Sequence, residues 1–203
     1  MIPKIIHLIW FDKPTKRVLD EYINFKVLNP NWTVILWEEE SLYNQFPFLR
    51  IMEEKGCDHA WKSDYARIFL INKYGGIYSD IDAHCLRAWD EVPDKVGDKI
   101  LVCGFPIRLD PGNIETHVIG CPVGGIERVE HLLLTSDVIF EVPVWQNIIR
   151  IQPNLFISPQ NWFNAMREAD AVYSIHNDRR LESWREARAL LPRQIPVSAS
   201  SIQ

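Results

Sequence analysis

Hydrophobic residues in the N-terminal part of the chain fall into alternating strand and helix patterns. Lys4–Phe11 (KIIHLIWF) is an almost continuous apolar run of strand-forming residue types, as a strand covered on both faces requires. In Thr15–Pro30 the apolar side chains recur at helical spacing, and Asn29-Pro30 ends that pattern. Trp32–Trp37 returns to a strand pattern. The order strand, helix, strand predicts a parallel α/β sheet.

A second helix and strand pair follows, and it carries the most polar strand end of the chain. Ser41–Lys55 is predicted to be helical with an interruption near Pro47. A longer helix is predicted over His59–Tyr74 and should end at Gly75-Gly76, where positive φ angles cost little. The next segment, Ile77–Asp82 (IYSDID), is predicted to be a strand.

The remaining pattern predicts shorter elements and no repeats. Strands are expected at Lys99–Phe105, His117–Cys121, Asn154–Ser158 and Ala171–His176, helices at Gly125–Leu134, Gln160–Glu168 and Leu181–Leu191, and a loose tail over 193–203. A chain of 203 residues is long enough for one domain with a large core. We therefore expect a single domain over residues 1–203.

Charge and cysteine usage exclude several classes of protein. The net charge is −5 and no Lys/Arg block occurs, so a partner nucleic acid is not expected. The apolar N-terminal run is too short to span a bilayer and lacks an export signal. The four cysteines form no CxxC pair, which favours buried reduced thiols over disulfides or zinc. We expect a cytoplasmic protein, or one that lies peripherally at a membrane surface.

Two aspartates, Asp80 and Asp82, stand at the end of the predicted strand. If the strand continues through them, alternate side chains share a face, so Tyr78, Asp80 and Asp82 point the same way. Two strand residues span roughly 6.6 Å, which lets both carboxylates approach one divalent cation. Hard oxygen ligands suit Mg²⁺ or Mn²⁺ and leave coordination positions for a diphosphate. Two solvated aspartates at a strand end would show the same pattern.

The preceding helix places a second charged pair close by in the sequence. Asp64 and Arg67 are three residues apart and therefore share one face of that helix. Such a pair is usually a surface salt bridge. On a helix that leads directly into the two aspartates, it could instead hold a sugar hydroxyl and a phosphate oxygen.

Three motifs together carry a resemblance to a known family. The segments IPKIIHLIWF, LNPNWTVILW and SDYARIFLINKYGGIYSDID resemble the DXD glycosyltransferases of the capsular-polysaccharide and α-1,6-mannosyltransferase type. That retaining family has the GT-A nucleotide-diphospho-sugar transferase fold, and it is similar to the catalytic domains of large glucosylating toxins. The resemblance covers Ile2–Leu86 and implies a mostly parallel sheet with helices on both faces. It also implies a UDP- or GDP-sugar donor, Mn²⁺ or Mg²⁺, and a carbohydrate or glycolipid acceptor.

The resemblance makes residues 1–90 the nucleotide-sugar-binding half and residues 91–192 the acceptor-side half with a closing segment, and it assigns roles in the first of these. Trp10, with Ile9 beside it, would stack on the nucleotide base, and Asp64 and Arg67 would bind the sugar hydroxyls and the diphosphate region. Tyr78 matches the aromatic residue beside the motif. Asp80 would contact ribose, sugar and metal, and Asp82 would be the direct metal ligand. The catalytic assignment is accordingly Asp80, Asp82 and Arg67.

Towards the C terminus the resemblance is looser. The segment YSIHNDRRLESW suggests that His176, or Asn177 beside it, completes the metal site or holds the diphosphate, and that Ser183 and Trp184 close over the donor. One departure from the family pattern is Ser79, which replaces an aliphatic residue and suggests a less buried strand face. His84 and Cys85 follow the motif and are expected to be structural.

Two rival interpretations remain. A phosphotransferase of the haloacid-dehalogenase type also has a DxD motif after an apolar strand, but on its first strand rather than its third. A non-catalytic sugar-binding module of the same fold would keep the motifs without turnover. The motifs name no nucleophile, so front-face attack, with the departing phosphate taking the acceptor proton, is what the resemblance implies for a retaining enzyme.

Overall fold

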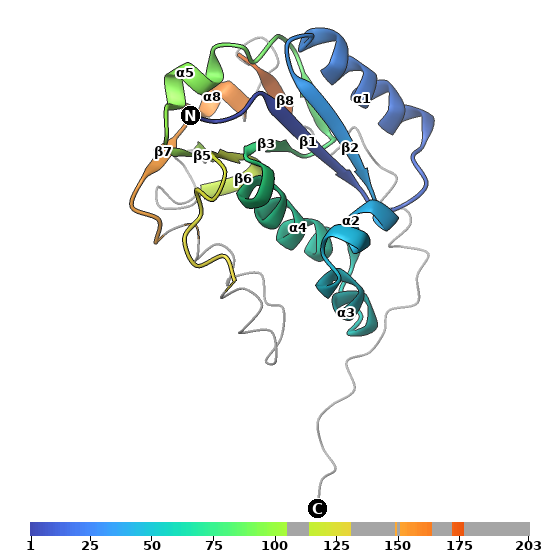
Figure 1. Ribbon diagram of the computed structural model, residues 1–203. Helices are drawn as coiled ribbons and strands as arrows, with labels where there is room; N and C mark the ends of the chain where they lie inside the picture. Colours follow the sequence, from blue (N-terminus) through green and yellow to red (C-terminus); the bar gives the residue numbers. More distant parts are fainter. Residues whose placement is uncertain (105–113, 131–148, 150, 164–171, 177–203) are drawn as a thin grey trace, which may run out of the picture.

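The chain folds around a six-stranded sheet whose strand order is β2-β1-β3-β6-β5-β7 (Figure 1). The computed structural model describes residues 1–104, 114–130, 149, 151–163 and 172–176. The sheet strands are β1 (Ile5–Trp10), β2 (Thr33–Glu38), β3 (Gly76–Ser79), β5 (Ile100–Gly104), β6 (Ile114–Cys121) and β7 (Leu155–Ile157). A separate pair of strands, β4 (Ala83–Cys85) and β8 (Ser174–His176), is antiparallel.

Most neighbouring strands of the large sheet run parallel, as expected. Strand β1 pairs in parallel with β2 and β3, and β5 pairs in parallel with β7. The exception is β6, which lies antiparallel between β3 and β5. The α/β sheet expected from the sequence is therefore confirmed, with one reversed strand in its interior.

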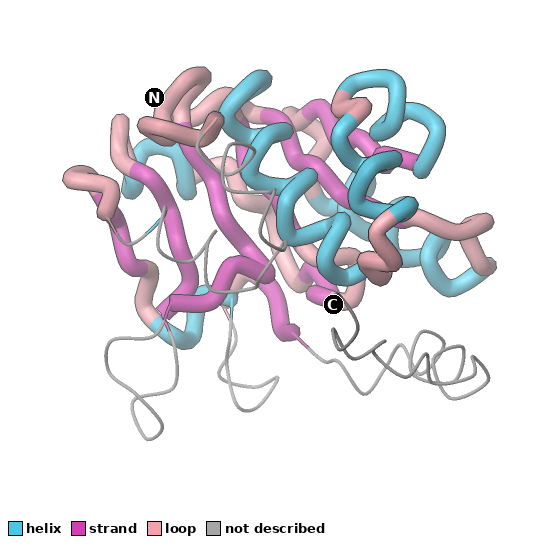
Figure 2. The backbone as a smooth tube through the Cα atoms, turned by 90° about the horizontal axis from the view of Figure 1, so that it is seen from below, coloured by secondary structure: helices cyan, strands magenta, loops and turns pink. Residues whose placement is uncertain are grey.

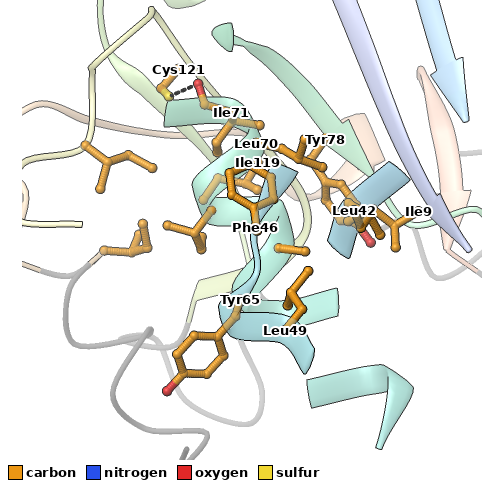
Figure 3. Close-up of a cluster of buried hydrophobic side chains, with 14 of the residues drawn as sticks. Ile9, Leu42, Phe46, Leu49, Tyr65, Leu70, Ile71, Tyr78, Ile119 and Cys121 are labelled. Atoms are coloured by element: carbon orange, nitrogen blue, oxygen red, sulfur yellow. Dashed lines mark hydrogen bonds between the residues drawn. The ribbon is translucent and has the colours of Figure 1, made fainter. Parts of the chain in front are cut away.

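Helices cover both faces of this sheet (Figures 1 and 2). The helices are α1 (Lys16–Leu28), α2 (Glu39–Gln45), α3 (Phe48–Glu54), α4 (His59–Tyr74), α5 (Val92–Val96) and α8 (Gln160–Phe163). One core joins α2, α3 and α4 to the face of the sheet that carries Ile9, Tyr78 and Ile119 (Figure 3). The other core joins α1 to the opposite face, which carries Ile6, Leu8 and Ile77.

Local sequence signals fix the two longest helices. The Thr15 hydroxyl accepts a hydrogen bond from the backbone N–H of Val18 at the start of α1. Asp58 caps α4 in the same way, through the N–H of Trp61. Helix α4 ends at Gly75-Gly76, whose φ angles are +66° and +96°. A Cβ on Gly76 would lie 2.5 Å from the Ile5 carbonyl oxygen, so glycine is required where the chain turns back into the sheet.

Several expected elements differ from the structure. Strand β3 ends at Ser79, so Asp80 and Asp82 lie in a turn rather than on the strand. Ser79 is fully buried, so the expectation of a less buried strand face is wrong. Within the expected helix Gly125–Leu134, the described residues up to Glu130 form turns. The expected helix Leu181–Leu191 lies outside the described residues.

The expectations for the cysteines and for Pro47 are confirmed. Cys85, Cys103 and Cys121 are buried free thiols, and Cys57 is a half-buried one. Pro47 separates α2 from α3. Among the residues that the structure describes, none of the helices has the length and apolar character needed to cross a membrane.

The buried cation of Lys62 fastens α2 and α3 to α4. Its side chain is 1% exposed, and Nζ donates a hydrogen bond to the Tyr43 hydroxyl at 2.8 Å. Nζ also lies 3.4 Å from a Glu53 carboxylate oxygen and 3.5 Å from one of Glu39, and 4.8 Å from the centre of the Phe11 ring. Groups from three segments, α2, α3 and the residue after β1, therefore converge on this ammonium group of α4.

We expect Lys62→Ala to lower the free energy of unfolding by about 3 kcal/mol, because it opens a cavity and removes the cation that these groups share. Lys62→Met keeps most of the volume and should cost about half as much. Urea denaturation measures both. Lys16→Met removes an 89% exposed lysine from a salt bridge and should change stability by less than ~1 kcal/mol. Equal stability of Lys62→Ala and Lys16→Met would contradict this role.

A buried histidine, His7, makes the fold sensitive to acid. Its Nε2–H donates to the Gly75 carbonyl oxygen at 2.8 Å, and its Nδ1 accepts from the Trp37 indole N–H at 3.0 Å. The bond from Trp37 requires the neutral ring, because a protonated Nδ1 cannot accept a hydrogen bond. Burial lowers the pKa of His7 from 6.5 to about 4, although the bond to Gly75 opposes the shift.

Between pH 6.5 and 4 the unfolded chain therefore binds a proton at His7 that the folded chain does not. The free energy of unfolding should fall as the pH falls through this window, by about 3 kcal/mol at pH 4. Urea denaturation across the window should show a flatter pH dependence for His7→Gln than for the wild type. The exposed His59, replaced by Gln, serves as the control for the loss of a histidine outside the core. An unaltered slope in His7→Gln would rule out this titration.

Candidate functional site

The sequence-predicted aspartates lie in a tight turn at the end of β3. The Asp80 backbone N–H donates to the His117 carbonyl oxygen at 2.7 Å, which anchors the start of the turn to β6. The N–H of Ala83 donates to the Asp80 carbonyl oxygen at 3.0 Å and closes the turn. The chain leaves the strand at Ser79, so the prediction that strand alternation extends to Asp82 is wrong, although Tyr78 and Asp80 do contact each other. A turn places the two carboxylates instead.

Arg67 of α4 gathers the charged residues of the site. Its Nη2 lies 2.6 Å from a carboxylate oxygen of Asp64 and 3.5 Å from one of Asp80. Its Nη1 donates to the Thr116 carbonyl oxygen at 2.9 Å and lies 3.3 Å from the Thr116 hydroxyl, and Nε donates to the Ser63 carbonyl oxygen at 3.3 Å. The residue is only 7% exposed. Arg67 therefore acts in this structure as a clamp on two carboxylates.

The ring of Tyr78 packs against the Arg67 guanidinium. The Arg67 guanidinium lies over its ring, 4.7 Å from the ring centre. The Tyr78 hydroxyl donates to a carboxylate oxygen of Asp80 at 2.5 Å and lies 3.2 Å from the Ser63 hydroxyl. Tyr78 itself is 2% exposed. Asp80 is therefore oriented from two directions, by a phenol and by a guanidinium.

The electrostatics of the cluster follow from burial and close charges. Burial disfavours the charged form of Arg67, but Tyr78, Asp80, Asp64 and Asp82 outweigh it and raise the Arg67 pKa above its ordinary value. Burial raises the pKa of Asp64, and Arg67 offsets only part of that shift. Burial also raises the pKa of Tyr78. The site thus holds a permanent cation surrounded by acidic groups.

Asp80 and Asp82 are suitable ligands for a divalent cation, but the described residues do not supply a complete set of metal ligands. Asp80 and Asp82 supply hard carboxylate oxygens, as Mg²⁺ and Mn²⁺ require, and both are half-buried. Across the part of the chain that the structure describes, no three His, Cys, Asp or Glu side chains meet as a set of metal ligands. The backbone of His176 pairs with Ala83, the residue after Asp82. The register therefore brings the third predicted ligand next to the turn.

The predicted base-stacking residue lies at the end of the neighbouring strand. Trp10 is the last residue of β1, is half-buried, and has a buried indole N–H without a hydrogen-bond partner among the described residues. Ile9 instead packs its side chain into the α4-side core and is 5% exposed. Ser183 and Trp184 lie outside the described residues.

Two residues after the motif have structural partners. His84 Nδ1 lies 2.8 Å from a carboxylate oxygen of Glu21 on α1. Cys85 is buried and its thiol donates to the Arg87 carbonyl oxygen at 3.3 Å. These contacts agree with the structural roles expected for both residues.

Sequence reasoning missed two supporting residues, Ser63 and Thr116. Ser63 stands beside Asp64 in the sequence, so its position was a usable signal. Thr116 lies 49 residues after Arg67, and no motif surrounds it. Only the pairing of β6 with β3 reveals that it belongs to the site.

Comparison with known proteins finds similarity in the part of the chain that contains the candidate site. Residues 15–99 match the family model described as the glycosyltransferase sugar-binding region containing DXD motif. Inositol phosphoceramide mannosyltransferase 3 of Schizosaccharomyces pombe is 27% identical over 131 residues, which cover 61% of this chain and 34% of that protein. A mannosyl phosphorylinositol ceramide synthase of Saccharomyces cerevisiae, CSH1, is 26% identical over 128 residues, covering 59% and 31%. The chain spans about a third of the length of these curated relatives.

Solved structures share the fold. The PaToxG glycosyltransferase aligns with a TM-score of 0.53 at 14% identity, covering 74% of this chain and 65% of that one. A glycosyltransferase involved in the glycosylation of the major capsid of PBCV-1 aligns with a TM-score of 0.51 at 14% identity, covering 92% and 98%. The resemblance stated from the three N-terminal motifs is therefore confirmed: residues 15–99 match the sugar-binding region of DXD-motif glycosyltransferases, and the fold is similar to that of solved glycosyltransferases of the GT-A type.

Proposed function

We propose that the chain transfers a sugar from a nucleotide-diphosphate sugar to an acceptor hydroxyl with the help of Mn²⁺ or Mg²⁺. The observation that carries the proposal is the buried Arg67 clamp, which holds Asp64 and Asp80 beside the turn that contains Asp82. The clamp lies at the carboxyl edge of the parallel strands, where ligands of α/β folds bind.

Charge explains why a metal belongs to the proposal. Asp64, Asp80 and Asp82 with Arg67 carry a net formal charge of −2. A diphosphate approaching these four side chains would be repelled. A bound divalent cation would supply the positive charge that attracts the diphosphate and stabilises it as it leaves. Asp80 and Asp82 would hold that cation, with His176 as the third protein ligand.

The protein groups would contribute orientation and charge balance. Arg67 and Tyr78 fix the direction of the Asp80 carboxylate, which removes the need to order it during the reaction. Asp64 is positioned by the same guanidinium and would accept hydrogen bonds from sugar hydroxyls. Trp10 would offer its ring to the nucleotide base. The GT-A relatives named in the resemblance retain anomeric configuration, and we propose retention here as well.

For the molecule that receives the sugar, we propose a chemical class rather than a single compound. The two fungal relatives are named for mannosylation of inositol phosphoceramide, which is a property of those proteins. For this chain we propose a carbohydrate or glycolipid hydroxyl. A peripheral position at a membrane surface would suit a glycolipid.

The test combines binding with turnover. A thermal-shift screen of UDP- and GDP-sugars with Mn²⁺ should show stabilisation that disappears with EDTA. Release of free sugar or transfer to added glycans should then require the same metal. Metal-dependent binding without any turnover would indicate a sugar-binding module of the same fold, and a phospho-aspartate would indicate a phosphotransferase. Absence of both binding and turnover would refute the proposal.

A further inference from the structure

The outward face of α1 carries an apolar stripe. Leu19, Ile23 and Val27 are 42%, 54% and 68% exposed. They recur every fourth residue, so they line up along one side of the helix. The buried residues of α1 are Val18 and Phe25, and the five residues from Val18 to Ile23 turn the helix by about 140°. The stripe therefore points away from the core, on a helix that lies at the outside of the fold (Figure 1).

Basic residues surround this stripe on a protein that is acidic overall. The exposed basic residues are Lys13, which precedes α1, and Lys16, Arg17 and Lys26 on the helix. Residues 13–27 hold four basic and two acidic residues, a net charge of +2, whereas the whole chain carries −5. Both acidic residues are paired within the protein. Asp20 accepts from Lys16 Nζ at 2.7 Å. A Glu21 carboxylate oxygen lies 2.8 Å from His84 Nδ1.

The apolar stripe and the positive charge together fit the surface of a bilayer that contains anionic phospholipid. Apolar side chains of an interfacial helix enter the boundary between headgroups and acyl chains, while lysine and arginine extend to the lipid phosphates. Anionic headgroups attract such basic residues. A second copy of the chain fits less well, because it would bring two positive faces together and because lysine is depleted in protein interfaces.

We infer that α1 docks the protein on an anionic phospholipid membrane. The apolar stripe enters the headgroup boundary, and Arg17 and Lys26 contact the lipid phosphates. The inference goes beyond the proposed function, because docking requires neither a nucleotide sugar nor a metal.

Helix α1 is also joined to the candidate site. The Asn24 side-chain N–H donates to the Cys85 carbonyl oxygen at 2.8 Å, and Glu21 pairs with His84. Both partners lie on β4, which follows the turn that contains Asp82. A helix with its side chains is about 10 Å thick, so a docked membrane would lie roughly one helix diameter from this turn. Docking would therefore present the site to acceptors in the same membrane.

Cosedimentation of the full chain with lipid vesicles, without nucleotide or Mn²⁺, tests the docking. At about 0.1 M salt, vesicles of phosphatidylcholine with about 30% phosphatidylserine should be bound at least about tenfold more tightly than vesicles of phosphatidylcholine alone. Ile23→Gln removes the centre of the stripe and should weaken binding to the anionic vesicles about tenfold. Arg17→Gln combined with Lys26→Gln should remove most of the preference for them. These side chains are exposed, so the urea midpoints of the variants should match that of the wild type.

Ile51→Gln is the matched control. Ile51 is 50% exposed, but it lies on α3 near the acidic Glu53 and Glu54. This variant should bind the anionic vesicles as the wild type does. Equal binding of the wild type to both kinds of vesicle, binding to neither, or equal binding by Ile23→Gln and Ile51→Gln would overturn the docking and leave the proposed sugar transfer in place. Dimers that form without vesicles and that Ile23→Gln abolishes would identify a second copy as the occupant and would also overturn it.

Discussion

Replacing Arg67 by Met should lower the free energy of unfolding by about 3–5 kcal/mol, because it leaves two half-buried carboxylates without their shared cation. It also strips a hydrogen-bond donor from the Thr116 carbonyl oxygen. A domain of this size has roughly 5–15 kcal/mol of stability, so the variant should be close to unfolding. Urea denaturation monitored by tryptophan fluorescence measures the loss.

Arg50 offers a matched control for Arg67. It also lies over a tyrosine ring, 4.6 Å from the centre of Tyr43, and pairs with a glutamate, but its side chain is 51% exposed. Arg50→Met should cost no more than about 1 kcal/mol. Similar losses of unfolding free energy in the two variants would show that burying Arg67 adds nothing to the stability of the protein. Combining Arg67→Met with Asp64→Asn should recover part of the loss, because the uncompensated carboxylate is then neutral.

The second large effect is expected at Asp82, and it concerns ligand binding rather than folding. At a donor concentration of 100 Kd, binding stabilises the native state by about 2.7 kcal/mol. For a chain of 203 residues this corresponds to a rise in melting temperature of roughly 5–10 °C. Asp82→Asn should abolish the Mn²⁺-dependent part of this rise, because the amide oxygen is a weaker ligand for a hard cation.

The variant should itself fold, since Asp82 lies in a turn and is half-buried. Its melting temperature without ligand is therefore expected to remain close to that of the wild type. Asp20→Asn, which neutralises an exposed aspartate on α1, should keep the full metal-dependent rise. An undiminished rise in Asp82→Asn would remove Asp82 from the metal site, whatever the outcome for transfer.

Local signals were sufficient to predict the N-terminal elements. The bounds His59–Tyr74 of α4 agree with the prediction, because Asp58 and Gly75 mark its two ends in the sequence itself. Strand β1 and helix α1 were predicted for similar reasons. The short elements β4 and α5 were missed, since three and five residues are too few to show a period.

Non-local contacts explain the errors. The apolar alternation of IYSDID suggested a strand through Asp82, but the chain turns at Asp80, whose N–H is anchored to the His117 carbonyl oxygen of β6. The predicted helix at Gly125 is replaced by turns in its described part, where Asn72 of α4 accepts from Gly124 and Ile126. Both contacts join segments far apart in the chain, so no local pattern could have revealed them.

The candidate site was predicted in its members but not in its arrangement. Asp64, Arg67, Tyr78 and Asp80 were named from motifs, and the structure brings these four together. The sequence suggested that Arg67 faces the nucleotide sugar. In the structure its guanidinium N–H groups are directed at oxygen atoms of the protein. The roles of Asp82, His176, Ser183 and Trp184 stay predictions.

The reversed strand β6 sets a boundary for any exchange of parts between this chain and its relatives. It pairs with β3 from Gly76 to Ser79, and Thr116 within it receives the guanidinium of Arg67. The sugar-binding region matched by the family ends at residue 99, before this strand begins. A chimera cut at that point would sever the clamp from its anchor, so a graft that changes acceptor preference must carry residues 114–121 along with the N-terminal portion.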